Sequence, residues 1–405
     1  MNYAEAAEKL QKYGQEHVLA YYDELSDEDK EKLLEQIADT DFSVIKEAQN
    51  QAPRGIIKPI DVMALPEIEA GHEHFREEGL RAIKAGKVGA LLLAGGMGTR
   101  LGSDDPKGMY NIGLTRDVYI FERLISNLLD VVNESGTYIQ LFVMTSEKNH
   151  DATVNFFKEQ NYFGYDSAYV AFFRQDMAPA TDYEGKVYME SKGRISTSPN
   201  GNGGCFLSMK KSGMMDIVHK KGIEWLNVFA VDNVLQRIAD PVFVGAVLSG
   251  NYAVGSKVIR KVAPEEKVGV MCMEDGRPSI VEYIELTEQM RYQKNENGEY
   301  AYNFGVILNY LFKVSDVEKV LERSLEYHIA DKKIPYIDNQ GKPVSPSEPN
   351  GHKYEQLILD MIRMLDSCLP FEVVREKEFA PIKNKTGVDS VDSARGLLKL
   401  NGVEL

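Results

Sequence analysis

Residues 88–108 constrain the fold of this 405-residue chain more than any other segment, because an apolar run there ends abruptly in glycines. The run, residues 88–94, is typical of a parallel strand buried on both faces. Gly95, Gly96 and Gly98 follow it at once. Glycine has no Cβ, so the turn can adopt left-handed conformations and its backbone N–H groups can approach an anion closely. The segment predicts a buried strand of an α/β sheet that ends in a tight anion-binding loop.

Two cations follow these glycines, which a plain turn does not need and phosphate groups do. They are Arg100 and Lys107. Two commoner glycine loops do not fit: Leu101 stands where a dinucleotide-binding loop has its third glycine, and Lys107 precedes Gly108 where a P-loop has glycine before lysine. The segment therefore predicts a phosphate-binding loop, for a nucleoside triphosphate.

Composition excludes several other classes of protein. The net charge of −15 argues against nucleic acid as a general partner, and it makes any phosphate site a local island of positive charge. The three cysteines are scattered and form no CxxC motif, which fits a reduced compartment. The N-terminus is acidic and lacks signal-peptide character, and no apolar run approaches the length of a membrane span. We expect a cytoplasmic protein with no nucleic-acid and no membrane partner.

Strand and helix patterns alternate from residue 88 onward, which predicts an α/β fold with a doubly wound sheet. The expected strands of this part are 88–94, 139–144, 168–173 and 227–231, with helices at 120–133, 150–160 and 216–221. The pattern then changes to successive strands, so we expect a mixed or antiparallel patch at 257–262, 268–273 and 279–283. Helices near 315–328 and 354–366 and a last strand at 372–375 complete the expected order.

Three regions follow from this pattern. Residues 1–60 are expected to be an N-terminal helical segment, in which Ser26 caps a helix. Residues 61–383 are expected to form the catalytic domain, and 384–405 a short C-terminal tail. Residues 51–87 contain three prolines and read as a connector.

Several motifs occur together in a fixed order along the chain. They lie at 93–108, 172–175 with Pro179, 198–204, 231–233, 281–283, 303–305, 333–336, 349–351 and 379–384. In this order they closely resemble the UDP-N-acetylhexosamine pyrophosphorylases of the eukaryotic-type UDP-sugar pyrophosphorylase family, over roughly residues 80–395. The resemblance implies a mixed, Rossmann-like nucleotidyltransferase sheet of the GT-A-like type.

The implied reaction is attack by an oxygen of a sugar 1-phosphate on the α-phosphorus of UTP, with release of pyrophosphate. Such transfers need positioning and charge neutralisation more than a covalent nucleophile. By resemblance, Arg100 and Lys107 hold the β- and γ-phosphates, and Lys383 lies on the α-phosphate and the sugar phosphate. Asp232 ends an apolar strand, where open α/β sheets bind their ligands, and its hard carboxylate suits Mg²⁺. Mg²⁺ is the expected cofactor.

The resemblance also implies contacts for the base and the sugar. The expected UTP and uridine contacts are Gly95, Gly96, Gly98, Gln175 and Gly201. The Gln175 amide carries both a donor and an acceptor, as the imide edge of uracil requires. The expected sugar contacts are Asn202, Glu282, Tyr283 and Asn303. N-acetylglucosamine 1-phosphate is the expected sugar substrate.

The chain departs from the family pattern at a few positions. Met97 replaces a usual glutamine, Asn200 replaces the aspartate of the sugar turn, and Phe304 and Val306 flank Asn303 where small or polar residues are usual. The chain ends at Leu405, so we expect a truncated C-terminal region.

Three alternative functions remain open at this point. One is the same chemistry on glucose 1-phosphate or N-acetylgalactosamine 1-phosphate. Another is a catalytically inactive nucleotide-sugar-binding protein, which would predict damage to Lys107, Asp232 or Lys383; all three are intact. A dinucleotide-binding oxidoreductase is disfavoured by the failed glycine pattern.

Overall fold

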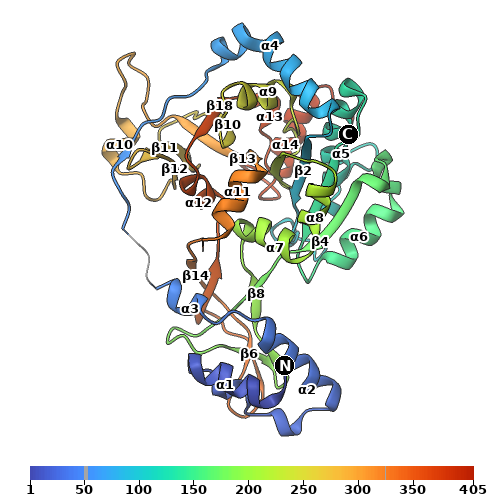
Figure 1. The fold of residues 1–405 in the computed structure, drawn as a ribbon, viewed down its shortest axis with the longest axis vertical. Coiled ribbons are helices and arrows are strands. Elements are labelled where there is room, and N and C mark those ends of the chain that lie inside the picture. The colour runs from blue at the N-terminus through green and yellow to red at the C-terminus, as the bar shows by residue number, and fades with distance from the viewer. Residues whose placement is uncertain (50–52, 324) are drawn as a thin grey trace. The chain divides into compact units, whose positions relative to one another are not determined.

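The computed structural model describes residues 1–49, 53–323 and 325–405, and the chain divides into two compact units (Figure 1). Unit 1 comprises Met1–Pro53, Asp176–Gly204 and Ser324–Ile358. Unit 2 comprises Arg54–Gln175, Cys205–Arg323 and Leu359–Leu405. Each unit is thus assembled from three stretches that are separated in the sequence.

The described part of unit 2 contains a ten-stranded sheet. Its main path runs in the order β1 (Ile57–Lys58), β11 (Val270–Glu274), β13 (Phe304–Lys313), β9 (Trp225–Ala230), β2 (Val88–Leu93), β3 (Gln140–Thr145) and β4 (Val170–Arg174). Off this path, β12 (Arg277–Val281) pairs with β11, and β10 (Val254–Arg260) pairs with β13 and with β18 (Cys368–Glu372).

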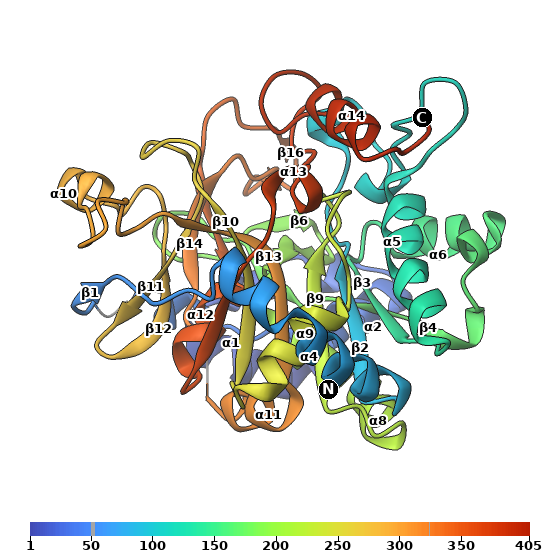
Figure 2. The same ribbon diagram turned by 90° about the horizontal axis from the view of Figure 1, so that it is seen from above.

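The strands β9, β2, β3 and β4 are parallel, so their carboxyl ends meet at one edge of the sheet (Figure 2). Leu93 at the end of β2 is level with Met144 on β3 and with Ala230 on β9. Every residue of β2 and β3 is buried, as the apolar run of β2 predicted for that strand. Gly95 lies in the loop after β2, Asp232 in the loop after β9, and Gln175 directly after β4. We call this edge the carboxyl edge.

Antiparallel strands complete the sheet. β13 is antiparallel to β9, β10 and β11, whereas β10 and β18 are parallel. The predicted doubly wound, mixed α/β sheet is confirmed.

Helices pack against the strands of the sheet. Those outside the N-terminal segment are α4 (Leu65–Lys84), α5 (Ile120–Ser135), α6 (His150–Glu159), α7 (Cys205–Lys211), α8 (Met214–Lys220), α9 (Pro241–Ser249), α10 (Glu288–Tyr292), α11 (Val314–Leu321), α12 (Ile358–Met364), α13 (Arg375–Glu378) and α14 (Val391–Leu400). Helices α4 and α9 lie side by side (Figures 1 and 2). A Cβ at Gly79 or Gly245 would collide with the backbone of the other helix, so these glycines permit the close approach.

Three sequence predictions of local structure were wrong. The supposed connector at 51–87 contains α4, because Pro66 lies in the first turn of that helix, where its missing N–H costs nothing. The helix expected at 315–328 ends at Leu321, and residues 328–332 form β14. The last strand lies at Cys368–Glu372, before the predicted 372–375. Among the strands of the described residues it pairs with β10 alone, and Met63 forms a single bridge with Phe371 on its other side. A strand at the edge of a sheet tolerates Pro370.

Unit 1 combines the N-terminal helices with short strand pairs. The helices are α1 (Tyr3–Tyr13), α2 (Asp27–Asp39) and α3 (Val44–Glu47). The pairs are β5 (Met177–Pro179) with β8 (Thr197–Pro199), β6 (Met189–Ser191) with β7 (Arg194–Ile195), β14 (His328–Lys332) with β17 (Gly351–Glu355), and β15 (Tyr336–Ile337) with β16 (Pro343–Val344). Ser26 Oγ accepts the Asp29 N–H at 3.2 Å, which confirms the predicted helix cap. Residues 50–52 of the predicted 1–60 segment lie outside the described residues.

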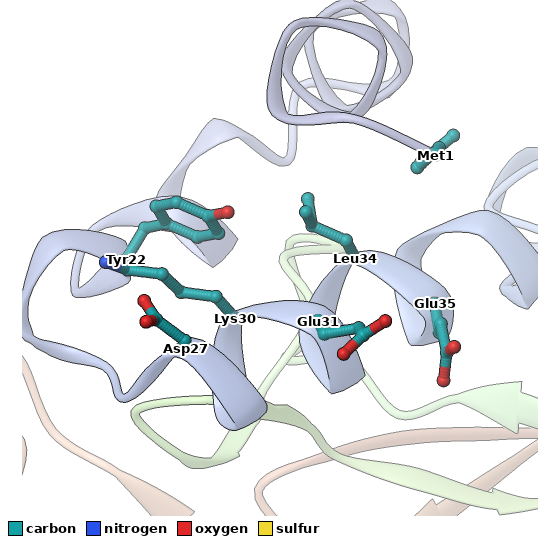
Figure 3. Close-up of a pocket in the computed structure, with 7 residues that line it drawn as sticks. All are labelled: Met1, Tyr22, Asp27, Lys30, Glu31, Leu34 and Glu35. Atoms are coloured by element: carbon teal, nitrogen blue, oxygen red, sulfur yellow. The ribbon is translucent and has the colours of Figure 1, made fainter.

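A shallow pocket of about 370 Å³ lies on α2 in unit 1 (Figure 3). Asp27, Glu31 and Glu35 line it from successive turns of that helix, and the Lys30 amine lies 5.5 Å from the centre of the Tyr22 ring. None of the predicted site residues lines this pocket.

Candidate active site

The glycine loop after β2 folds back on itself as a narrow hairpin. The Gly98 N–H donates to Asp105 O at 2.8 Å, and the Lys107 N–H donates to Gly96 O at 3.1 Å. Between these bonds Met97 and Pro106 pair as an isolated bridge. Lys107 then begins one turn of 3-10 helix, Lys107–Met109. The hairpin therefore brings Lys107 next to the glycines although it follows them by several residues.

Gly95 and Gly96 have different surroundings. A Cβ at Gly95 would collide with the Gln175 amide, so the structure brings these two predicted uridine-binding residues into contact. A Cβ at Gly96 would meet no atom within 4 Å, and Gly96 is not among the residues with positive φ. Neither packing nor backbone conformation requires glycine at position 96. The open space beside its backbone is what a bound phosphate would need.

Asn149 fixes the conformation of this loop. Its side chain is fully buried, and its Nδ2 donates to Ala94 O at 2.9 Å and to Gly96 O at 3.3 Å. Its Oδ1 accepts the Ser146 N–H at 2.7 Å. Sequence reasoning missed Asn149, because a single asparagine after a strand carries no distinctive pattern.

The predicted charged residues of the site lie around Lys107 at the carboxyl edge. Lys107 Nζ lies 3.7 Å from Asp232 Oδ2, and both side chains are largely buried. Burial lowers the pKa of Lys107, the Asp232 carboxylate opposes that shift, and the positive charges of Lys383 and Arg100 lower the pKa further. Arg100, Lys107, Lys383 and Asp232 therefore form one group, which we call the charge cluster.

Lys383 reaches this cluster because its segment runs beside the residues that follow β9. The Ile382 N–H donates to Asp232 O at 2.9 Å, and Asn233 pairs with Pro381 as an antiparallel bridge. The Lys383 ammonium also lies 3.0 Å from Asp389 Oδ2. These contacts join two parts of the chain that are far apart in the sequence.

The donor set at the cluster suits a metal with few protein ligands. Within 1–49, 53–323 and 325–405, no three His, Cys, Asp or Glu side chains gather as they would around a fully caged ion. Asp232 supplies a single carboxylate beside the glycine loop. This fits Mg²⁺, which keeps several waters and takes further ligands from substrate phosphates.

Gln175 directly follows β4, and its position is fixed from both sides. Its backbone N–H donates to Thr145 O at 2.8 Å, and its side chain is buried against Gly95. The amide therefore lies at the carboxyl edge, next to the loop.

Glu282, Tyr283 and Asn303 lie at the ends of neighbouring strands. β12 and β13 flank β11, where Val270 is level with both Val281 and Gly305. Asn303 O accepts the Lys261 N–H at 2.8 Å. The unusual Phe304 stacks against Arg260, whose guanidinium lies 4.8 Å from the centre of its ring. The structure thus gives Phe304 a packing partner.

Gly201 and Asn202 belong to unit 1, where they hold a turn against residues 356–358. Gly201 has φ +87°, and a Cβ there would collide with Gln356 O. Asn202 Oδ1 accepts the Ile358 N–H at 2.9 Å. The positive φ and the close packing of this turn therefore explain why position 201 is glycine. The turn also uses the Oδ1 of Asn202 as a hydrogen-bond acceptor. In the same turn, Asn200 Oδ1 is buried without a hydrogen-bond partner in the described structure.

Comparison with known proteins identifies the family. Residues 25–399 match the family described as UTP–glucose-1-phosphate uridylyltransferase. The chain belongs to this family. Membership makes it a nucleotidyltransferase that uses UTP and a sugar 1-phosphate, as the sequence predicted, and it excludes the oxidoreductase alternative.

Relatives cover most of the chain. It is 36% identical to UDP-N-acetylhexosamine pyrophosphorylase-like protein 1 of Mus musculus, over 94% of this chain and 80% of that protein. It is 35% identical to UDP-N-acetylglucosamine pyrophosphorylase of Saccharomyces cerevisiae, over 92% of this chain and 84% of the yeast protein. The crystal structure of uridine diphosphate N-acetylglucosamine pyrophosphorylase from Trypanosoma brucei has a TM-score of 0.82 and 28% identity, covering 96% of this chain and 83% of that one. The predicted family resemblance is confirmed. None of the helices described here is long and apolar enough to cross a membrane.

Proposed function

We propose that this enzyme condenses UTP with N-acetylglucosamine 1-phosphate to give UDP-N-acetylglucosamine and pyrophosphate. The observation that carries the proposal is the charge cluster, in which Arg100, Lys383 and Asp232 lie close enough to Lys107 to shift its pKa, beside the glycine loop after β2. The choice of sugar is supported by the similarity to the UDP-N-acetylglucosamine pyrophosphorylases of Saccharomyces cerevisiae and Trypanosoma brucei.

In the proposed reaction an oxygen of the sugar phosphate forms a bond to the α-phosphorus of UTP. The bond from that phosphorus to the bridging oxygen breaks, and its electron pair leaves on pyrophosphate. Arg100 and Lys107 would hold the β- and γ-phosphates and neutralise the charge that develops on them. Lys383 would orient the sugar phosphate and the α-phosphate, which otherwise repel each other. The backbone at Gly96 and Gly98 would approach the triphosphate.

Asp232 would hold Mg²⁺. When bound, this ion would supply positive charge to the phosphate oxygens. Asp232 also lies close enough to Lys107 to orient its ammonium.

The uracil base would lie against Gly95 and Gln175. The Gln175 amide can donate to and accept from the imide edge of uracil, and its fixed backbone limits where that amide can point. Gly201 would contribute from the turn that follows β8. Asn202, Glu282, Tyr283 and Asn303 would contact the sugar, with amide groups available for an acetamido substituent.

Gly96 gives a test that separates ligand binding from folding. Gly96→Ala should leave the thermal unfolding midpoint nearly unchanged, because the added methyl meets no protein atom. It should raise the KM for UTP strongly, since the methyl occupies the space proposed for phosphate. Gly396→Ala is the matched control: its Cβ also meets open space, and Gly396 lies in α14. Normal UTP kinetics in Gly96→Ala would remove this glycine from the site.

The sugar proposal is tested by comparing sugar 1-phosphates at saturating UTP and Mg²⁺. N-acetylglucosamine 1-phosphate should be preferred over glucose 1-phosphate by about 5- to 150-fold in kcat/KM, because a pocket built for the acetamido group leaves polar groups unpaired with glucose at about 1–3 kcal/mol. Preference for glucose 1-phosphate or for N-acetylgalactosamine 1-phosphate would refute the choice of sugar and leave the uridylyl transfer intact.

A further inference from the structure

A network of buried amide side chains reaches the residue that follows Asp232. It consists of Asn227, Asn233, Gln236 and Asn309, each at most 1% exposed. Asn227 Nδ2 donates to Asn309 Oδ1 at 2.8 Å, and Asn309 Nδ2 donates to Gln236 Oε1 at 3.2 Å. Gln236 Nε2 donates in turn to Asn233 O at 2.9 Å. The network therefore connects the interior strands β9 and β13 to the backbone next to Asp232.

The side chain of Asn233 extends this network to the segment that carries Lys383. Its Nδ2 donates to Glu378 O at 2.8 Å, and its Oδ1 accepts the Ala380 N–H at 2.9 Å. An amide can make both bonds at once, whereas an aspartate in the same place has no donor for the Glu378 carbonyl. The start of the segment is anchored separately, because Glu378 Oε2 lies 2.6 Å from Nζ of the fully buried Lys257.

The two hydrogen bonds of the Asn233 side chain, which we call the clamp, hold the segment without adding a charge to the cluster. Lys383 and Lys107 carry like charges, which disfavour a close approach of the two ammonium groups. The Asn233 amide is neutral, so it fixes the backbone that leads to Lys383 without neutralising either cation.

We propose that Asn233 is a positioning residue: its two hydrogen bonds to residues 378–380, together with the bond from the Ile382 N–H to Asp232 O, set the distance between Asp232 and Lys383. The inference rests on the proposed roles of Asp232 and Lys383. Asn233 itself would contact neither substrate.

The test uses the full chain and measures pyrophosphate release. Asn233→Ala should lower kcat by about 10- to 100-fold, the usual effect of losing a group that orients an active-site ligand. The KM for UTP should change much less, because the glycine loop keeps its own anchor in Asn149. Asn233→Asp should resemble Asn233→Ala, since it keeps the acceptor and loses the donor. Gln140→Ala is the matched control: Gln140 is a buried amide at the opposite end of β3, bonded to Leu141 O and Tyr169 O. It should lower the unfolding midpoint and leave kcat unchanged.

A double-mutant comparison decides whether Asn233 acts through Lys383. In a Lys383→Ala background, Asn233→Ala should cause little further loss, because residues that act as a unit are not additive. Fully additive losses, or an equal loss of kcat in Gln140→Ala, would overturn the proposal.

Hydrogen exchange provides a readout independent of turnover: the Ala380 amide should exchange faster in Asn233→Ala, and unchanged exchange would also overturn it. An unaltered chain that is inactive with every sugar would refute the proposed function and this inference together. An active chain with unaffected Asn233 variants would refute the inference alone.

Discussion

Asp232→Ala is expected to abolish turnover, with a loss on the order of 10³-fold in kcat, while the protein remains folded. The substitution removes the one carboxylate of the charge cluster, and with it the proposed ligand for Mg²⁺. It also leaves the Lys107 ammonium without the anion 3.7 Å away. Steady-state kinetics of pyrophosphate release, together with a thermal melt, measure both effects.

The matched control for this variant is Asp366→Ala. Asp366 also lies 3.7 Å from a cation, the Arg277 guanidinium, but is almost fully exposed. Its loss should change neither turnover nor stability measurably. Near-normal activity of Asp232→Ala with Mg²⁺, or full activity of the unaltered enzyme in EDTA, would show that Asp232 is not the metal-binding carboxylate.

Lys107→Ala is expected to lower kcat/KM for UTP by about 10²- to 10³-fold, which is the usual effect of removing one donor at a developing charge. Stability should change little or even rise, because the variant removes a largely buried ammonium that Arg100 and Lys383 disfavour. Lys319→Ala, at an exposed helical ion pair, serves as the control. A Lys107→Ala protein that folds poorly yet uses UTP normally would assign Lys107 a purely structural role.

The same residue predicts a pH dependence. The pKa of Lys107 is lowered, so its positive charge is present at low pH and is lost as pH rises through the lowered pKa. The pH profile of kcat/KM reports ionisations of the free enzyme. The apparent pKa of its alkaline limb should therefore lie below the usual lysine value of about 10.4. That limb should disappear from the residual activity of Lys107→Ala. An identical alkaline limb in both proteins would assign it to another group.

The sequence predicted the parallel part of the fold well, for a physical reason. β2 and β3 are buried on both faces, so apolar residues dominate both, although β3 begins with Gln140 and ends with Thr145. The glycines after β2 mark the carboxyl edge. Helix α4 was missed because prolines suggested a connector, whereas a proline in the first helical turn is compatible with a helix. The position of β18 was missed because Pro370 argues against a strand unless the strand is known to lie at an edge.

Only those residues of the candidate site that belong to a sequence motif could be predicted. The motifs nominated Arg100, Lys107, Asp232 and Lys383, and the structure brings these four together. Asn149 and the clamp role of Asn233 came from the structure alone, since a buried amide is identified by its hydrogen-bond partners and not by its neighbours in sequence. The same holds for unit 1, which combines three remote stretches of chain.

We propose that the charge cluster promotes transfer of the uridylyl group of UTP to a sugar 1-phosphate, and the proposed function depends on this transfer. Its most direct test is pyrophosphate release by the unaltered chain, with UTP, N-acetylglucosamine 1-phosphate and Mg²⁺ each left out in turn. We predict rapid release when all three are present and none when any one is missing. Release that does not depend on the sugar phosphate, or no release with any sugar 1-phosphate, would contradict it.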